Sequence, residues 1–189
     1  MLRLILVRHG QTAWNAQNRI MGRTDVPLNE KGQQQALVIT RTLCDQQIDH
    51  IFCSPQLRAM ETVQPLSQIK KMPIQVDERL SELRFDRWQG KVFDEIKADP
   101  VYIERRQNLF MAPHAEVETV QEVMLRTKDL LGDLSKRDGC ILCASHMDPL
   151  KAMVMQIQNL PLEVFFEFEI DHAEPMFFIF ENQTWHKER

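Results

Sequence analysis

Two near-continuous apolar runs constrain the fold of this chain more than any other feature of its sequence. Leu2–Val7 and Gly139–Ser145 lack the regular polar alternation of a strand with one face in water. Runs of this kind are typical of parallel strands that helices bury on both faces. Because parallel strands build sites at their carboxyl ends, the residues that follow each run are the first candidates for function.

Helix and strand patterns alternate along the chain. Asn29 is an N-cap signal, Thr119 forms a capping box with Glu122, and Ser54-Pro55 reads as an N-cap with proline in the first helical position. The pattern predicts helices over about 30–45, 55–69, 120–136 and 148–159, short helices near 94–97 and 101–109, and strands at 50–53, 74–76, 165–170 and 176–181. This alternation predicts an α/β fold, a three-layer α/β/α sandwich with a mostly parallel sheet. We expect a single domain over residues 1–189, with a small helical cap insertion at about 91–118.

Composition excludes several classes of protein. The formal net charge of -4 argues against non-specific binding of nucleic acid. The sequence has no apolar run as long as a membrane span and no signal-peptide pattern, so we expect a cytoplasmic protein with no membrane partner. Nothing in the sequence indicates the oligomeric state.

Four cysteines are present, and two of them form a C-x-x-C pair, Cys140 and Cys143. Such a pair is a redox motif when it begins a helix. Here the pair lies in a run predicted as a strand, where residues three apart face opposite sides. We therefore expect buried free thiols. Cys44 and Cys53 lack a zinc-ligand spacing, so no metal site is expected.

Polar residues that suit one chemistry follow four of the predicted strands. Arg8 and His9 follow the first strand, Arg58 lies in the first turn of the helix after the second, Glu82 follows the third, and His146 follows the fourth. Taken singly, each residue is more simply explained by a structural role or an exposed ion pair. If the strand ends meet in one crevice, however, two arginines, two histidines and one carboxylate come together.

Such a set is suited to an oxyanion, and to phosphate above all. The planar guanidinium offers a fixed fork of donors that matches phosphate oxygens. Helix N-termini add backbone N–H groups and a favourable dipole.

The sequence around these residues resembles the histidine phosphatase superfamily, which includes the cofactor-dependent phosphoglycerate mutases. The resemblance begins in LVRHGQTAWN and continues in order through NRIMGRTDVPLNEKGQQQA, FCSPQLRAMETV, LSELRFDRWQG and CASHMDPLKAMV. It extends from Met1 to about Val154. Arg-His-Gly alone is a weak motif, whereas the full series in this order is specific.

The resemblance implies a role for each matching residue. His9 would be the nucleophile that becomes phosphorylated, and Arg8, Arg58 and His146 would hold the phosphoryl group. Glu82 would protonate the leaving oxygen and then activate the attacking water. No cofactor and no metal is implied, and the partner would be a small phosphorylated metabolite. The resemblance also places three residues at the phosphate end of the substrate pocket: Asn15, Gly22 and Met147.

The chain departs from the family pattern in three places. Met147 stands where most members have glycine, and a methionine keeps the backbone N–H but would resist a positive φ. Met21 stands where phosphatase members often carry a polar side chain that contacts the phosphate. In RFDRWQG, Asp86 replaces the usual glycine and Gln89 the usual glutamate. These departures bear on the substrate and on the efficiency of turnover.

The short cap favours a phosphatase over a mutase. About 28 residues separate Gly90 from Thr119, whereas phosphoglycerate mutases of the family carry a longer insertion there. The short form resembles α-ribazole phosphatase and the broad-specificity phosphatases. The alternatives are a mutase, a phosphate-binding regulatory protein with reduced turnover, and a metal-dependent hydrolase. The last would use His9, Glu82, His146 and Asp148, and two arginines in the same crevice argue against a cation there.

Overall fold

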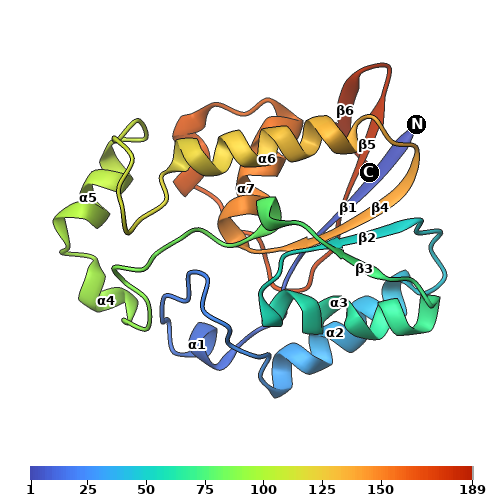
Figure 1. Cartoon of the computed structure of the whole chain (residues 1–189), viewed down its shortest axis with the longest axis horizontal. Helices are drawn as coiled ribbons and strands as arrows, with labels where there is room; N and C mark the ends of the chain where they lie inside the picture. Colours follow the sequence, from blue (N-terminus) through green and yellow to red (C-terminus); the bar gives the residue numbers. More distant parts are fainter. Residues whose placement is uncertain (189) are drawn as a thin grey trace.

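The computed structural model describes residues 1–188, which build a six-stranded sheet with helices on both faces (Figure 1). The strand order is β3-β2-β4-β1-β5-β6. β1 to β4 run parallel, and β5 joins β1 antiparallel. The predicted mostly parallel sheet is confirmed. The strands are β1 Leu2–Arg8, β2 His50–Cys53, β3 Ile74–Val76, β4 Gly139–Ser145, β5 Met176–Glu181 and β6 Thr184–Lys187.

The helices form the two outer layers of a three-layer sandwich, as predicted. Figure 1 shows α2 and α3 below the sheet and α6 and α7 above it. No helix within residues 1–188 is both long enough and apolar enough to cross a membrane. The helices are α1 Ala13–Ala16, α2 Glu30–Leu43, α3 Leu57–Lys70, α4 Phe93–Ile96, α5 Pro100–Gln107, α6 Val120–Leu134 and α7 Met147–Gln158, with the 3-10 helices η1 Glu78–Leu80 and η2 Leu162–Phe166.

The apolar run of β1 fills both layers of the core because alternate side chains point to opposite faces. Leu4 and Leu6 pack with α6 and α7, whereas Ile5 and Val7 pack with α2 and α3. The cysteines of β4 divide in the same way, Cys143 with the first set and Cys140 with the second. The C-x-x-C pair therefore consists of buried free thiols on opposite faces of the sheet, as predicted.

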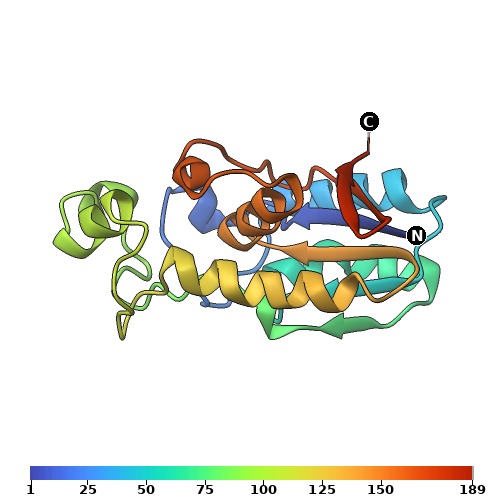
Figure 2. The same ribbon diagram turned by 90° about the horizontal axis from the view of Figure 1, so that it is seen from above.

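The segment predicted as a cap carries α4 and α5. Both helices lie beyond the carboxyl ends of the parallel strands and project from the body of the molecule (Figures 1 and 2). Arg105 of α5 ties them to the body, since its guanidinium lies over Phe85 and Phe166 and pairs with Asp148 of α7 at 3.1 Å.

Ser54 is not the N-cap that the sequence pattern predicts. α3 begins at Leu57 and its N-cap is Gln56, whose side chain makes no capping bond; the Leu57 N–H donates instead to Asp25 Oδ1 at 2.9 Å. The Ser54 hydroxyl instead contacts His146 Nε2 at 2.7 Å. His146, which follows the neighbouring strand β4, thus engages the hydroxyl that was expected to cap the helix.

The strand predicted at 165–170 is also wrong. The alternating pattern is present, but the first two residues of this segment are the end of η2, where Phe165 is buried between α6 and α7. The place beside β1 is occupied by β5, which pairs with β6. Asn182 and Gln183 join these strands with φ of 50° and 63°, the left-handed conformation that a two-residue hairpin turn requires. The final strand pair is therefore displaced toward the C-terminus.

Candidate active site

The carboxyl ends of β1 and β4 bring two histidines together. Arg8 is paired with Ser145 in the strand register, so the next residues, His9 and His146, emerge side by side. The His9 N–H donates to the Ser145 carbonyl at 2.9 Å, and the two imidazole rings lie 5.1 Å apart. Both side chains are buried, at 1% and 0% exposure. Residues 137 positions apart thus meet because the sheet is parallel at its centre.

His9 is held in one neutral tautomer. Its Nδ1 lies 2.7 Å from the Gly10 carbonyl oxygen, which can only accept, so Nδ1 carries the proton. Nε2 is then unprotonated and accepts from Arg58 Nε at 3.3 Å. Burial, together with the charges of Arg58 and Arg8, lowers the pKa of His9 well below its ordinary value of 6.5. An unprotonated Nε2 at neutral pH can act as a nucleophile.

Arg58 is fully buried in the first turn of α3 and is fixed by backbone carbonyls. Nη1 donates to Thr24 and Nη2 donates to Gly22, each at 2.8 Å. A guanidinium has five N–H donors, and the bond to His9 occupies a third, so two are left to meet an oxyanion. Burial lowers the pKa of Arg58 to about 10, which leaves it cationic at neutral pH. The hydrogen bond from Arg58 to the Gly22 carbonyl thus places Gly22 next to the predicted phosphate site.

Arg8 approaches the same place from the end of β1. Its Nη1 donates to the Ile170 carbonyl at 2.6 Å and contacts Met147 Sδ at 3.9 Å. Its Nε is buried and has no hydrogen-bond partner within residues 1–188. A buried donor without a partner is costly, and a phosphate oxygen would satisfy it.

Met147 occupies the glycine position of the family without backbone strain. It is the first residue of α7 and has right-handed helical conformation, so the positive φ that only glycine tolerates is not used. Its Sδ accepts the Ile170 N–H at 3.2 Å. The methionine therefore fits the turn after His146, and its side chain packs toward the segment that holds Arg8.

Asn15 faces the site from α1, a short helix that the sequence pattern did not predict. Asn15 Oδ1 accepts from Thr12 N at 3.0 Å and from Thr12 Oγ1 at 2.9 Å, which turns the amide so that Nδ2 is free for a ligand. Asn15 lines the cavity that Met147 and His172 also line. Met21 is buried behind this loop, where its Sδ lies 3.3 Å from Thr12 Oγ1.

His172 lies at the mouth of the site. For this histidine, in IDHAEP, the sequence allows a place at the mouth of the crevice and favours a structural or exposed role. The side chain is half-buried and its Nδ1 donates to the His9 carbonyl at 2.8 Å. Its ring is 5.2 Å from that of His9. Burial and the charge of Arg8 lower the pKa of His172 to about 4. A cavity of about 860 Å³ opens here, between Arg8, Phe93 and His172.

Glu82 is the carboxyl group of the site. Its Oε1 accepts the Leu83 N–H at 2.9 Å. Burial and the neighbouring charge of Asp148 raise the pKa of Glu82 to about 7, against the opposing effect of Arg58 and Arg8. A substantial fraction of Glu82 is therefore protonated at neutral pH, as a general acid must be.

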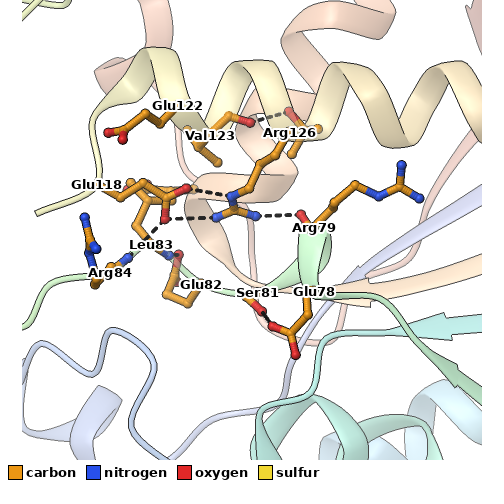
Figure 3. Close-up of polar contacts among 12 residues, drawn as sticks. Glu78, Arg79, Ser81, Glu82, Leu83, Arg84, Glu118, Glu122, Val123 and Arg126 are labelled. Atoms are coloured by element: carbon orange, nitrogen blue, oxygen red, sulfur yellow. Dashed lines mark hydrogen bonds and ion pairs between the residues drawn. The ribbon is translucent and has the colours of Figure 1, made fainter. Parts of the chain in front are cut away.

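A buried ion pair braces the segment that carries Glu82 (Figure 3). Glu118 accepts from Arg126 Nε at 2.6 Å and from the Arg84 N–H at 3.1 Å. Arg126 also donates to the carbonyl of Arg79, so the brace holds the chain on both sides of Glu82. Arg23 completes it by donating to the Glu82 carbonyl at 3.1 Å and to Glu118 at 3.3 Å.

The residues of the brace were missed at the sequence level. Glu118 precedes a capping box, where a carboxylate usually faces water, and nothing in its neighbourhood marks it as buried. The same is true of Gln56, whose Oε1 accepts the Glu82 N–H at 3.1 Å. Only the fold shows that these side chains meet the strand ends.

Within residues 1–188, no group of three or more His, Cys, Asp or Glu side chains is arranged to hold a metal ion. His9, Glu82, His146 and Asp148, the set considered for a metal-dependent hydrolase, therefore do not form a ligand cluster. Asp148 is paired with Arg105 instead.

The chain matches known proteins over nearly its full length. A family model described as the histidine phosphatase superfamily (branch 1) matches residues 4–189. Phosphoserine phosphatase 1 of Hydrogenobacter thermophilus is 28% identical over 179 residues, which cover 92% of this chain and 84% of the relative. Glucosyl-3-phosphoglycerate phosphatase of Mycobacterium tuberculosis is 33% identical over 172 residues, covering 85% of this chain and 77% of that protein.

Solved structures extend the match to the fold. A variant of phosphoserine phosphatase from Entamoeba histolytica, in complex with phosphoserine, is 26% identical and superposes with a TM-score of 0.89, covering 100% of this chain and 96% of that one. Since the match runs through every strand and helix that carries the site, the chain belongs to branch 1 of the histidine phosphatase superfamily.

Proposed function

We propose that the protein is a phosphomonoesterase that hydrolyses a small organic phosphate through a phosphohistidine formed on Nε2 of His9. The observation that carries this proposal is the tautomer of His9. Its proton is held on Nδ1 by Gly10, and the unprotonated Nε2 lies 3.3 Å from the Arg58 guanidinium. A nucleophile and an oxyanion donor are therefore adjacent.

In the first step, Nε2 of His9 forms a bond to phosphorus while the ester P–O bond breaks. Arg8 and Arg58 donate to the non-bridging oxygens, where charge develops in the transition state. Glu82 transfers its proton to the leaving alkoxide, which departs as an alcohol. The Nδ1–H of the phosphorylated ring stays bonded to the Gly10 carbonyl.

In the second step, water replaces the histidine on phosphorus. Glu82, now a carboxylate, accepts the proton of the attacking water as the P–N bond breaks. Inorganic phosphate leaves, His9 returns to its neutral tautomer, and Glu82 is again protonated. Each turnover thus consumes one water and leaves every protein group in its starting state.

The proposed substrate is a small phosphorylated metabolite. The cavity of about 860 Å³ beside Arg8 has room for the alcohol part of such an ester, with Asn15 and Phe93 on its walls. Relatives named for phosphoserine and for glucosyl-3-phosphoglycerate support this substrate class. They do not single out one compound.

Rapid mixing with radiolabelled phosphoserine, followed by alkaline denaturation, tests the proposal. We expect an acid-labile phosphoryl group on the wild-type protein and none on His9→Ala. His186→Ala is the matched control, since His186 is exposed in β6 and lies outside the site. If a screen of phosphomonoesters shows turnover without any labelled protein, or equal labelling of His9→Ala, the phosphohistidine mechanism is excluded.

A further inference from the structure

A chain of hydrogen bonds joins His146 to the backbone of Glu82. The Glu82 N–H donates to Gln56 Oε1 at 3.1 Å, and the Ser54 hydroxyl donates to the same oxygen. Ser54 Oγ lies 2.7 Å from Nε2 of His146. Gln56 is 6% exposed, while Ser54 and His146 are fully buried. Of the four residues joined by these bonds, Ser54 and Gln56 have no part in the proposed reaction.

The direction of each bond in this chain is fixed. The Glu82 N–H can only donate, so the Gln56 amide must present its oxygen, and its NH₂ group points elsewhere. Because that oxygen can only accept, the single proton of the Ser54 hydroxyl points toward it. Ser54 Oγ can then only accept from His146. Neutral His146 therefore carries its proton on Nε2, a conclusion that needs no assumption about the substrate.

The other ring nitrogen of His146 is left with a lone pair. Nδ1 is buried and has no hydrogen-bond partner within residues 1–188. Its ring lies 5.1 Å from that of His9, the residue proposed to become phosphorylated. Phosphate oxygens are acceptors, so a lone pair facing them would be repelled. Nδ1 can bind an oxyanion only after it has gained a proton.

We propose that Gln56 is a positioning residue that fixes His146 in the Nε2–H tautomer, so that an oxyanion binds together with one proton taken up by Nδ1. This inference rests on the proposed function, because it assumes that the pocket receives a phosphoryl group. The inference adds a specific requirement to the proposed function. In the free protein His146 is a neutral hydrogen-bond acceptor, and in the complex with an oxyanion it is an imidazolium donor.

The charges around His146 agree with proton uptake that depends on the ligand. Burial lowers the pKa of His146 well below 6.5, and the charges of Arg58 of α3, Arg8 of β1 and Arg126 of α6 act in the same direction, as does any charge on the neighbouring His9. Without an anion the imidazolium is therefore disfavoured. A bound dianion offsets these cations and makes the protonated ring the stable form.

Sulfate is the probe that tests the inference, because it is a tetrahedral dianion that carries no proton of its own near neutral pH. Binding of sulfate to the full chain is measured by calorimetry in buffers of different ionisation enthalpy and over a range of pH. His9 and Glu82 can also take up protons when an anion binds. The informative quantity is therefore the difference in uptake between wild type and variants.

Gln56→Leu and Ser54→Ala are the test variants. In Gln56→Leu the Ser54 hydroxyl is free to donate to Nε2, so His146 can hold its proton on Nδ1 and bind sulfate without a further one. We expect the number of protons taken up on sulfate binding to fall by one. The roughly tenfold change in sulfate affinity per pH unit, which one linked proton causes, should be lost as well. Ser54→Ala removes the acceptor of the Nε2–H and should act in the same direction.

Gln35→Leu is the matched control. It deletes an amide whose Oε1 also accepts a backbone N–H near the site, that of Gln11 at 2.8 Å, but that contacts neither Ser54 nor His146. Its proton uptake should equal that of the wild type. Nitrogen-15 spectra of the His146 ring give a second readout: Nε2–H alone in the free protein, and both nitrogens protonated with sulfate.

The outcomes separate the inference from the function on which it rests. Equal proton uptake in wild type, Gln56→Leu and Ser54→Ala, or a free His146 protonated on Nδ1, overturns the inference while labelled His9 still supports the phosphatase. Failure of sulfate to bind and of any phosphomonoester to label His9 overturns both.

Discussion

Replacing Glu118 by glutamine should loosen the segment that carries Glu82, the proposed general acid. Glu118 and Arg126 are a buried pair, at 8% and 16% side-chain exposure, with their nearest atoms 2.6 Å apart. Removing one partner of a buried pair costs about 3–5 kcal/mol. Arg126 keeps its bond to the Arg79 carbonyl and some contact with solvent, so the lower end of about 3 kcal/mol applies.

This loss has a thermal and a kinetic signature. For a chain of this size each kcal/mol shifts Tm by about 2–4 °C, so Tm of Glu118→Gln should fall by about 6–12 °C. Glu82 would also be displaced, and a small displacement of a catalytic group costs on the order of a hundredfold in rate. The loss should be larger for an alkyl phosphate, which needs the acid, than for 4-nitrophenyl phosphate, whose leaving group does not.

Asp133→Asn is the control for this prediction. Asp133 lies in α6, the helix that also carries Arg126, and pairs with Arg79 of η1 at 2.8 Å. Its side chain is 50% exposed. Exposed pairs add little to stability, so Tm should stay within the error of wild type. Thermal unfolding by circular dichroism and steady-state kinetics check both variants. Equal Tm values for Glu118→Gln and Asp133→Asn, or equal rate losses with the two substrates, would refute the reasoning.

Three other predictions follow from the same contacts. The pKa of Glu82 in the free protein is about 7, so kcat/KM for an alkyl phosphate should fall as pH rises through that value. Asp148→Asn should lower this pKa and move the fall in kcat/KM to lower pH in a pH–rate profile. Arg105→Met should leave Asp148 unpaired and cost about 3 kcal/mol, with faster hydrogen exchange across α5 measured by mass spectrometry. The folded-state pKa values of His9 and His172 lie below the ordinary value of 6.5, so below that pH the unfolded chain binds more protons than the folded one. The contribution of these histidines to stability against urea should therefore be complete above pH 6.5 and fall as the pH drops toward about 4.

The sheet and the meeting of its strand ends could be predicted because both depend on patterns that a short window contains. An apolar run such as that of β1 has to be buried on both faces of the sheet. A parallel arrangement then brings the carboxyl end of β1 level with that of β4. The pairing of Arg8 with Ser145 then places His9 and His146 together.

The remaining parts depend on partners that no window contains. Ser54 has the sequence context of an N-cap, yet its hydroxyl is engaged by His146, which lies 92 residues later. The segment 165–170 alternates like a strand, but Phe165 contributes more by filling the space between α6 and α7. In both places a tertiary contact outweighs a local preference of about 1 kcal/mol.

The site has to keep a histidine and a carboxylic acid neutral among cations, and these two demands conflict. Arg58 and Arg8 keep His9 unprotonated, but the same charges stabilise the carboxylate of Glu82. Burial opposes this effect of the cations on Glu82, and the negative charge of Asp148 acts in the same direction as burial. Asp148 tolerates its position because Arg105 pairs with it from the far side. Docking of α5 and the pKa of Glu82 are therefore coupled: a change that detaches Arg105 should alter the protonation of the proposed general acid without contacting it.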